Sequence, residues 1–427
     1  MGMMIILERD KPRNIILWSF IFLSTQVVGY LIYIFSRFIF GKKRASLVKK
    51  KEEDDIYSSL IETKLKNKKI NTESEIFEFN TMAYNAKLTQ RNSCEFFNDY
   101  NEFKQDLIKS IQNAQSYIIL ELRKINSLDF QEIKEYLLSK AEDGTVVKVV
   151  HDKHLNRKLK KELKLGGVKV YRFSKYNTLG GIYANFRNQI VIDGTVAYLA
   201  NTFLKNKQLT KPFDKSEVIL KLKGEVVEEI DIATHKDYVF ASGKFMEYTP
   251  IATNMPKKEC QMQFVTNDYN TDIELLIIKA ICSAKKSIQL QLEEFIPTES
   301  ITSLLRFAIN SNIDVRLMVP LKTNRHSKYF ATRAYAKELA LMGANVYLYD
   351  GYIRFNSVVV DSEYVLYGSF TMDREHIASA LQNVMIIKNE DVVKHFNFMF
   401  DDGINNSYRI SNAKYMLLQE KFFKNFV

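Results

Sequence analysis

Cysteine is scarce in this sequence, and its scarcity limits the structures that the chain can form. Three cysteines occur, Cys94, Cys260 and Cys282, far apart in a chain of 427 residues. Their odd number and wide spacing argue against a disulfide framework or a cysteine-based zinc site, and they are compatible with a reducing compartment. Proline and glycine are also few, at 6 and 15 residues, and no low-complexity tract indicates extensive disorder.

The residues that are abundant point to a folded protein with an anionic partner. Hydrophobic residues make up 46% of the chain and aromatic residues 12%, which is enough for sizeable cores. The length predicts roughly two compact units and an accessory segment. The formal net charge of +11 indicates either nucleic acid or an anionic membrane surface as the partner.

One apolar segment, Ile15–Phe35, contains no charged side chain and is long enough to span a bilayer. A signal peptide would have a shorter apolar region and a cleavage site of small residues, whereas "SRFIFGKKR" follows here. Basic residues are fewer before the segment than after it: Arg9, Lys11 and Arg13 precede it, and Arg37, Lys42, Lys43, Arg44, Lys49, Lys50 and Lys51 follow it. The positive-inside rule therefore predicts a single-pass membrane protein whose globular domain is cytoplasmic.

The rest of the chain predicts an α/β fold made of two similar halves. The stretches "IKSIQNAQSYIILEL" and "IKAICSAKKSIQLQL" start at Ile108 and Ile278, and each continues into alternating helices and strands. We therefore predict two duplicated halves, each a mixed sheet flanked by helices, behind one N-terminal transmembrane helix. The predicted boundaries are 1–41 for the membrane anchor, 42–78 for a basic and acidic tether, 79–250 for the first half and 251–427 for the second half.

Each half closes with a predicted β-hairpin. Asp193-Gly194 forms the first turn and Asp361-Ser362-Glu363 the second, and the two aspartates follow the starts of the similar stretches at nearly the same distance. Because side chains alternate along a strand, Phe186 and Asn188 share one face in the first hairpin, as Arg354 and Asn356 do in the second. Antiparallel pairing should bring Asn201 near Arg187, and Gly368 and Ser369 beside Phe355. Two such polar patches would meet in one cleft.

The chain resembles a bacterial cardiolipin synthase of the phospholipase D superfamily, in which each half carries HxKxxxxD followed by G-[SG]-x-N. The resemblance is clearest in "EEFIPTESITSLLRFAINSNIDVRLMVP", "RAYAKELALMGANVYLYDG" and "GSFTMDRE". The N-terminal apolar segment resembles the second membrane helix of that family, and only "MGMMIIL" could be a remnant of the first. The resemblance implies a bacterial cell membrane location and a metal-free, cofactor-free reaction. One histidine attacks the phosphodiester, and the other protonates the departing glycerol oxygen.

The catalytic residues of that pattern are replaced here. Phe186 and Arg354 stand at the two histidine positions, Asn188 and Asn356 stand at the two lysine positions, and Asp193 and Asp361 remain. The first trailing motif reads Ala200-Asn201-Thr202-Phe203, and the second reads Gly368-Ser369-Phe370-Thr371. "HDK" at His151 and "HSK" at His326 also begin an HxK pattern, but Lys158 and Arg333 stand where it needs aspartate.

These departures favour an inactive cardiolipin-synthase-like protein that binds anionic phospholipid or regulates a partner, such as an active cardiolipin synthase. An active phosphatidyltransferase with a divergent active site is the alternative, and a nucleic-acid-associated protein is a third possibility that the membrane segment disfavours. The candidate phosphate-binding residues are Asn201, Arg354, Asn356, Ser369 and Thr371. The two aspartates are interpreted as turn residues, since aspartate tolerates an unusual φ and forms local hydrogen bonds with the backbone of its own turn.

Overall fold

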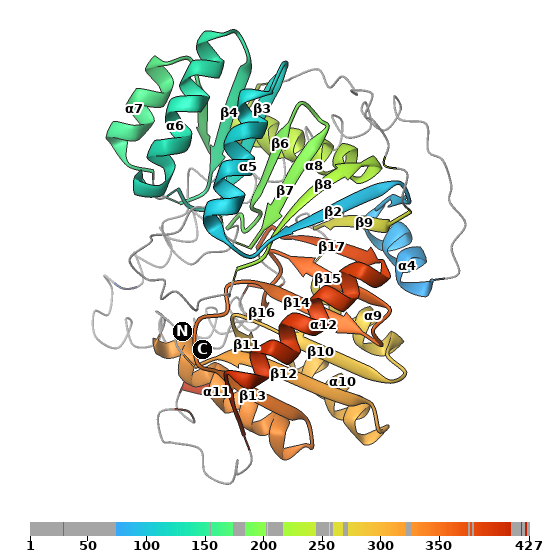
Figure 1. Ribbon diagram of the computed structural model, residues 1–427. Helices are drawn as coiled ribbons and strands as arrows, with labels where there is room; N and C mark the ends of the chain where they lie inside the picture. Colours follow the sequence, from blue (N-terminus) through green and yellow to red (C-terminus); the bar gives the residue numbers. More distant parts are fainter. Residues whose placement is uncertain are drawn as a thin grey trace. The chain divides into compact units, whose positions relative to one another are not determined.

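The computed structural model describes most of the chain after residue 73 (Figure 1). The described residues are Gly29, 74–125, 127–153, 155–173, 184–201, 203, 217–244, 256, 259–267, 272–321, 326–374, 376–377, 380–410, 420 and 423–424. Apart from Gly29, the predicted membrane segment lies outside these residues, and so does nearly all of the predicted tether. Among the residues that are described, no helix is both long and apolar enough to cross a membrane. The helices and strands named below all belong to one compact unit, Lys68–Asn425.

The first half forms a seven-stranded mixed sheet. Its strands, in spatial order, are β2 (Asn92–Phe97), β8 (Ile219–Gly224), β7 (Val196–Ala200), β6 (Gln189–Ile192), β3 (Tyr117–Leu122), β4 (Val146–His151) and β5 (Lys169–Arg172). Strands β3, β4 and β5 are parallel, and the other pairs are antiparallel. The helices of this half are α5 (Tyr100–Gln112), α6 (Ser127–Glu142), α7 (Arg157–Leu165) and α8 (Glu225–Ser242). Apolar residues of α5, α6 and α7 cover one face of this sheet and those of α8 cover the other.

The second half contributes eight strands to a nine-stranded mixed sheet. Its spatial order is β1 (Leu88–Thr89), β9 (Gln261–Thr266), β17 (Asn383–Lys388), β15 (Tyr364–Gly368), β14 (Asn356–Val360), β10 (Ser287–Gln291), β12 (Asp314–Pro320), β13 (Asn345–Tyr349) and β18 (Ser407–Arg409). Two short strands, β11 (Phe295–Ile296) and β16 (Met372–Asp373), pair in parallel beside it. The helices are α4 (Glu75–Tyr84), α9 (Glu274–Ser283), α10 (Glu299–Asn310), α11 (His326–Leu341) and α12 (Glu390–Asn405).

The two sheets have seven strands in the same order and with the same directions. The series β2-β8-β7-β6-β3-β4-β5 corresponds to β9-β17-β15-β14-β10-β12-β13. The predicted α/β class with mixed, helix-covered sheets is therefore confirmed. A shared apolar core joins the halves, because α8, α12 and the facing sides of both sheets contribute to one cluster that includes Val227, Met262, Tyr367 and Phe396.

Helix α4 and strand β1 precede the first half in the sequence but pack against the sheet of the second half. Strand β1 pairs with β9, with Leu88 opposite Gln263, and Ile76 and Phe77 of α4 enter the core beneath the second sheet. By the predicted boundaries these residues belong to the tether and to the first half, so this part of the prediction is wrong. A short amphipathic helix and a two-residue strand can cover either of two similar sheets, so their own pattern does not determine the choice.

Candidate functional site

The two hairpin aspartates fasten the start of a neighbouring strand. The carboxylate of Asp193 accepts hydrogen bonds from the backbone N–H groups of residues 115, 116 and 117, at 2.7, 2.7 and 2.8 Å. Asp361 accepts the corresponding bonds from residues 285, 286 and 287 at the same distances. Both aspartates have positive φ angles, 50° and 52°, which aspartate tolerates better than most residues. The positive φ angles agree with the predicted turn role, but the predicted local hydrogen bonds are wrong, because both carboxylates bind the start of another strand.

The two asparagines at the lysine positions bridge backbone segments. Asn188 Oδ1 accepts from the N–H of Arg123 at 2.9 Å, and its amide donates to the carbonyl of Asn201 at 2.8 Å. Asn356 Oδ1 accepts from the N–H of Glu293 at 2.9 Å, and its amide donates to the carbonyl of Phe370 at 2.6 Å. Both side chains are buried. A neutral side chain of this length therefore joins the end of a parallel strand to the return strand of the hairpin, in each half.

Phe186, at the first histidine position, is enclosed by other side chains. It is 7% exposed and packs with Ala184 and Ala380. The guanidinium of Arg123 lies 3.5 Å from the centre of its ring, and the ring of His376 lies 5.2 Å away. The phenyl ring thus fills the place between a cation and an imidazole, and it has no group that could attack phosphorus or transfer a proton.

Arg354, at the second histidine position, is 6% exposed and forms an ion pair with a carboxylate. Its Nη1 lies 3.1 Å from Oε1 of Glu217, and its guanidinium lies 5.2 Å from the centre of the Tyr352 ring. Asn201 of the first half donates to the carbonyl of Arg354 and to Oε2 of Glu293, both at 3.2 Å. The structure therefore brings Asn201 and Arg354 together, as expected if the two hairpin ends meet. A phosphate group at Arg354 would have to compete with Glu217.

Ser369 and Thr371, from the second trailing motif, are held by the strand beside them. Ser369 Oγ accepts from the N–H of Asn383 at 3.0 Å, and the N–H of Thr371 donates to Oε1 of Gln382 at 2.9 Å. Strand pairing places Gly368 opposite Asn356, so Ser369 lies beside Phe355 as the hairpin register predicts. Asn383 in turn donates to Oε1 of Gln189 at 2.9 Å, which ties the second motif to the first hairpin.

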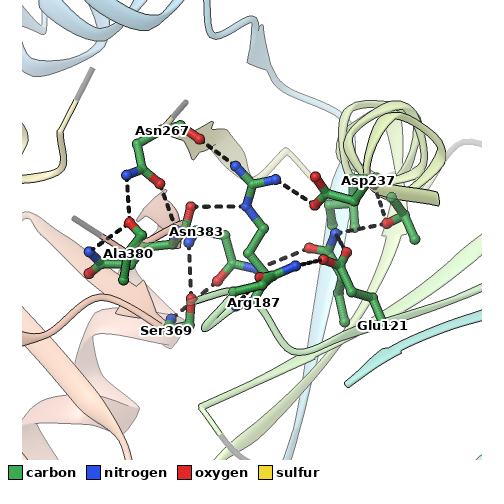
Figure 2. A network of polar contacts seen from close by, with 12 residues as sticks. Glu121, Arg187, Asp237, Asn267, Ser369, Ala380 and Asn383 are labelled. Carbon is green, nitrogen blue, oxygen red and sulfur yellow. Dashed lines mark hydrogen bonds and ion pairs between the residues drawn. The ribbon is translucent and has the colours of Figure 1, made fainter. Parts of the chain in front are cut away.

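A buried polar network crosses from one half to the other, and the sequence analysis missed it (Figure 2). Arg187 pairs with Asp237 of α8 and donates to the carbonyls of Asn267 and Gln382. Glu121 accepts from Asn185 and, at 2.7 Å, from Gln189. Burial, together with the nearby carboxylate of Asp237, raises the pKa of Glu121 well above its ordinary value. The available signal was an acidic residue within the otherwise apolar run "YIILEL".

A histidine, a lysine and an aspartate also meet beside Phe186, from segments that do not form a linear motif. His376 Nδ1 lies 2.6 Å from Oδ2 of Asp373, and Lys328 forms ion pairs with Asp373 and, at 3.2 Å, with Glu294. Burial alone would raise the pKa of Asp373, but the hydrogen bond with His376 and the charge of Lys328 hold that pKa below its ordinary value. Lys328 belongs to the "HSK" segment that the sequence analysis set aside. His376 does not begin an HxK pattern, so the motif did not indicate it.

The "HDK" segment of the first half is also built into the structure. His151 Nδ1 lies 2.7 Å from the carbonyl oxygen of Lys153. Burial raises the pKa of Asp152 to about 6, although Arg123 and Arg172 oppose the shift. Among the described residues, no group of His, Cys, Asp and Glu side chains is arranged to hold a metal ion.

Comparisons with known proteins agree with these features. A family model described as "Cardiolipin synthase, PLD-like domain" matches residues 277–403. The chain is 27% identical to the cardiolipin synthase of Clostridium perfringens (strain 13 / Type A), over 92% of this chain and 88% of that protein. It is 29% identical to the major cardiolipin synthase ClsA of Bacillus subtilis (strain 168), over 83% of this chain and 80% of that protein.

A solved structure shares the fold over most of the chain. The crystal structure of phosphatidylserine synthase from Haemophilus influenzae Rd KW20 aligns with a TM-score of 0.62 at 11% identity, over 83% of this chain and 97% of that one. This likeness supports the fold described above, two mixed sheets with the same strand order and with helices on their faces. The chain is therefore similar to bacterial cardiolipin synthases over most of its length, and residues 277–403 match the PLD-like domain of that family.

Proposed function

We propose that this chain works in phospholipid metabolism and recognises an anionic phospholipid of the phosphatidylglycerol or cardiolipin class. The names of its relatives support this proposal, because proteins called cardiolipin synthase match across most of its length. The matching order of seven strands and the matched contacts of Asp193 and Asp361 support an internal duplication. Two similar hairpin ends that meet at Asn201 and Arg354 would suit a substrate that contains a phosphodiester.

The first candidate activity is phosphatidyl transfer through a divergent active site. The relatives bear the name of an enzyme, and this favours an active protein over an inactive one. The specific structural observation is the cluster of His376, Asp373 and Lys328 beside Phe186. A carboxylate that fixes Nδ1 of an imidazole orients Nε2 as the atom for proton transfer or nucleophilic attack. His376 is 18% exposed, so part of its side chain reaches solvent.

The second candidate is phospholipid binding without turnover, alone or with a catalytic partner. It is favoured by the contents of the motif positions, where Phe186 is enclosed and the side chains of Asn188 and Asn356 hold backbone segments. Asn201, Arg354, Asn356, Ser369 and Thr371 would then surround the phosphate. In this case Arg354 would exchange Glu217 for a phosphate oxygen, which a guanidinium can bind in a bidentate manner.

The deciding experiment measures phosphatidyl transfer by the full chain, purified in detergent, with phosphatidylglycerol as donor and glycerol-type acceptors. Turnover that is lost in His376→Gln and retained in the matched control His395→Gln supports the first candidate. His395 is a suitable control because it stacks on Phe96, at a ring distance of 4.3 Å, and lies outside the cluster. If no variant shows turnover, phosphatidylglycerol binding that falls in Arg354→Ala supports the second. If the protein shows no turnover and no phosphatidylglycerol binding, the proposal as a whole is refuted.

The proposed location is the bacterial cell membrane, with one membrane helix at Ile15–Phe35 and the globular part in the cytoplasm. The uncharged span and the excess of basic residues after it support this location. A protease-protection assay in spheroplasts tests it. Digestion of the globular part in intact spheroplasts would show the opposite orientation.

A further inference from the structure

Helix α7 presents a face of basic side chains to solvent. Leu159 and Leu163 are buried beneath the helix, which packs beside α6 and β5 (Figure 1). The side chains that point away from this core are basic: Arg157, Lys158, Lys161 and Lys164 are exposed and Lys160 is half-buried. The one acidic residue of the helix, Glu162, is bound by Lys134 of α6 at 2.9 Å. The face therefore keeps a concentrated positive charge.

This charge does not stabilise the helix itself. The N-terminus of a helix carries partial positive charge and is stabilised by acidic side chains, as in the first turns of α4, α5, α8, α9, α10 and α12. The first turn of α7 contains no acidic residue and begins with Arg157 and Lys158. Its lysines also repel one another, and burial together with the charges of Lys164 and Arg172 lowers the pKa of Lys160. If helix stability alone determined the sequence, the first turn of α7 would be expected to carry acidic side chains.

The corresponding helix of the second half provides an internal comparison. Helix α11 lies between β12 and β13, as α7 lies between β4 and β5. Its cations are neutralised inside the fold: Lys328 pairs with Glu294 and Asp373, while Arg333 and Lys337 pair with Glu420. Within the part of the chain that the structure describes, no ion pair is formed by the five cations of α7. The basic face is thus specific to the first half.

An apolar residue lies at the edge of this face. Leu165 is 78% exposed, and together with Arg157, Lys160, Lys161 and Lys164 it lines a shallow, open hollow of about 350 Å³. Lysine stems and a leucine beside ammonium groups provide the two kinds of contact that an anionic bilayer surface accepts, namely charge at the head groups and apolar area just below them.

We propose that the basic face of α7 docks on the surface of an anionic phospholipid bilayer, with Leu165 entering the head-group region. The proposal extends the phospholipid function proposed above to a second surface, separate from the hairpin ends. Charge complementarity carries it, since each cation near an anionic surface contributes about 1 kcal/mol. The exposed leucine favours a bilayer over nucleic acid, whose phosphate backbone offers no apolar layer.

The test follows a single tryptophan in the full chain. The sequence has one tryptophan, Trp18, so Trp18→Phe with Leu165→Trp places the only indole at the edge of the α7 face. The protein is reconstituted into vesicles of phosphatidylcholine, with or without phosphatidylglycerol, and brominated phosphatidylcholine serves as the quencher. We expect quenching and a blue shift only when phosphatidylglycerol is present, and both should weaken as salt is added. In the same background, Phe307→Trp instead of Leu165→Trp is the positional control, because Phe307 is also exposed, at 68%.

A charge-matched pair of variants isolates the face. Replacing Lys158, Lys160, Lys161 and Lys164 by glutamine should shift the docking equilibrium by roughly 10²- to 10³-fold toward the undocked state. Replacing the exposed lysines Lys109, Lys285, Lys286 and Lys388 by glutamine changes the net charge equally and should leave docking nearly intact. Equal losses in the two variants, or quenching in pure phosphatidylcholine, would refute the proposal. If quenching is absent and this face instead binds duplex DNA in a salt-sensitive manner, the surface is assigned to nucleic acid and the proposal is refuted. None of these outcomes depends on turnover or on Arg354, so failure here leaves the proposed function untouched.

Discussion

Replacing the hairpin aspartates should cost stability rather than chemistry, and by a similar amount in each half. Asp193 and Asp361 each accept three backbone hydrogen bonds at 2.7–2.8 Å, at positions with φ near 50°. Hydrogen bonds to a charged group contribute about 1.5–3 kcal/mol each when buried, and about 1 kcal/mol is a better value here because the turn is partly exposed. Alanine also prefers negative φ, which adds about 1 kcal/mol.

Asp361→Ala should therefore lower the free energy of unfolding by about 4 kcal/mol, and Asp193→Ala by a similar amount. Asp361→Gly also removes the hydrogen bonds, but glycine adopts a positive φ without strain, so this change should cost about 1 kcal/mol less than the change to alanine. Asp361→Asn keeps one acceptor oxygen and tolerates the φ angle, so about 1–2 kcal/mol is expected. The order of destabilisation is then alanine, glycine, asparagine.

Thermal unfolding of the full chain in detergent measures these differences, and the alanine variants should unfold roughly 5 °C or more below the wild-type protein. The two sites lie in different sheets and bind different backbone groups, so the double variant should show nearly additive losses. A change below about 1 kcal/mol in Asp361→Ala would contradict the structural role of the three hydrogen bonds. Loss of lipid turnover in Asp361→Asn with unchanged stability would instead show that the carboxylate takes part in chemistry.

Three further predictions concern the same region. Ser362 has a positive φ of 54°, and the first half has Gly194 at the corresponding place. Ser362→Gly should therefore raise the free energy of unfolding by about 0.5–1 kcal/mol, measured by denaturant unfolding. Gly194→Ser should lower it, because a Cβ at this position would lie 2.7 Å from the Tyr117 hydroxyl. Folding raises the pKa of Glu121, so the folded state keeps that proton to higher pH than the unfolded chain, and the stability from this group is lost as the pH rises above about 4.5. Glu121→Gln should remove that loss. A plot of the free energy of unfolding against pH should then have a less negative slope between pH 5 and 8, by up to about 1.4 kcal/mol per pH unit. An unchanged slope would mean that Glu121 is ionised in the folded protein. Asn356→Ala should cost about 2–3 kcal/mol and Asn188→Ala a similar amount, because buried N–H and carbonyl groups lose their partners, and calorimetry that showed no loss would mean that water replaces the amides.

The class of fold and the two hairpins could be predicted from the sequence, because these follow from short-range patterns. Two similar series of alternating strands and helices, starting at Ile108 and Ile278, predicted the two matched sheets, and Asp193-Gly194 and Asp361-Ser362 predicted the turns. The hairpin register then followed from counting, so the positions of Asn201 and Ser369 were also predictable. The membrane segment and the domain boundaries remain predictions.

The contacts of the motif positions could not be predicted from the sequence, because they depend on how distant segments pack. The pairing of Arg354 with Glu217 joins residues 137 positions apart, and the cluster at His376 joins residues from three segments. No local pattern indicates such pairs, because each residue alone has the character of an ordinary surface charge. The same limit applies to Arg187, whose burial depends on how α8 and the second half cover the sheet, whereas the apolar run around Glu121 was a local signal of burial. Local patterns determine which face a side chain takes, whereas packing between distant segments determines whether that face meets solvent, a carboxylate or a phenyl ring.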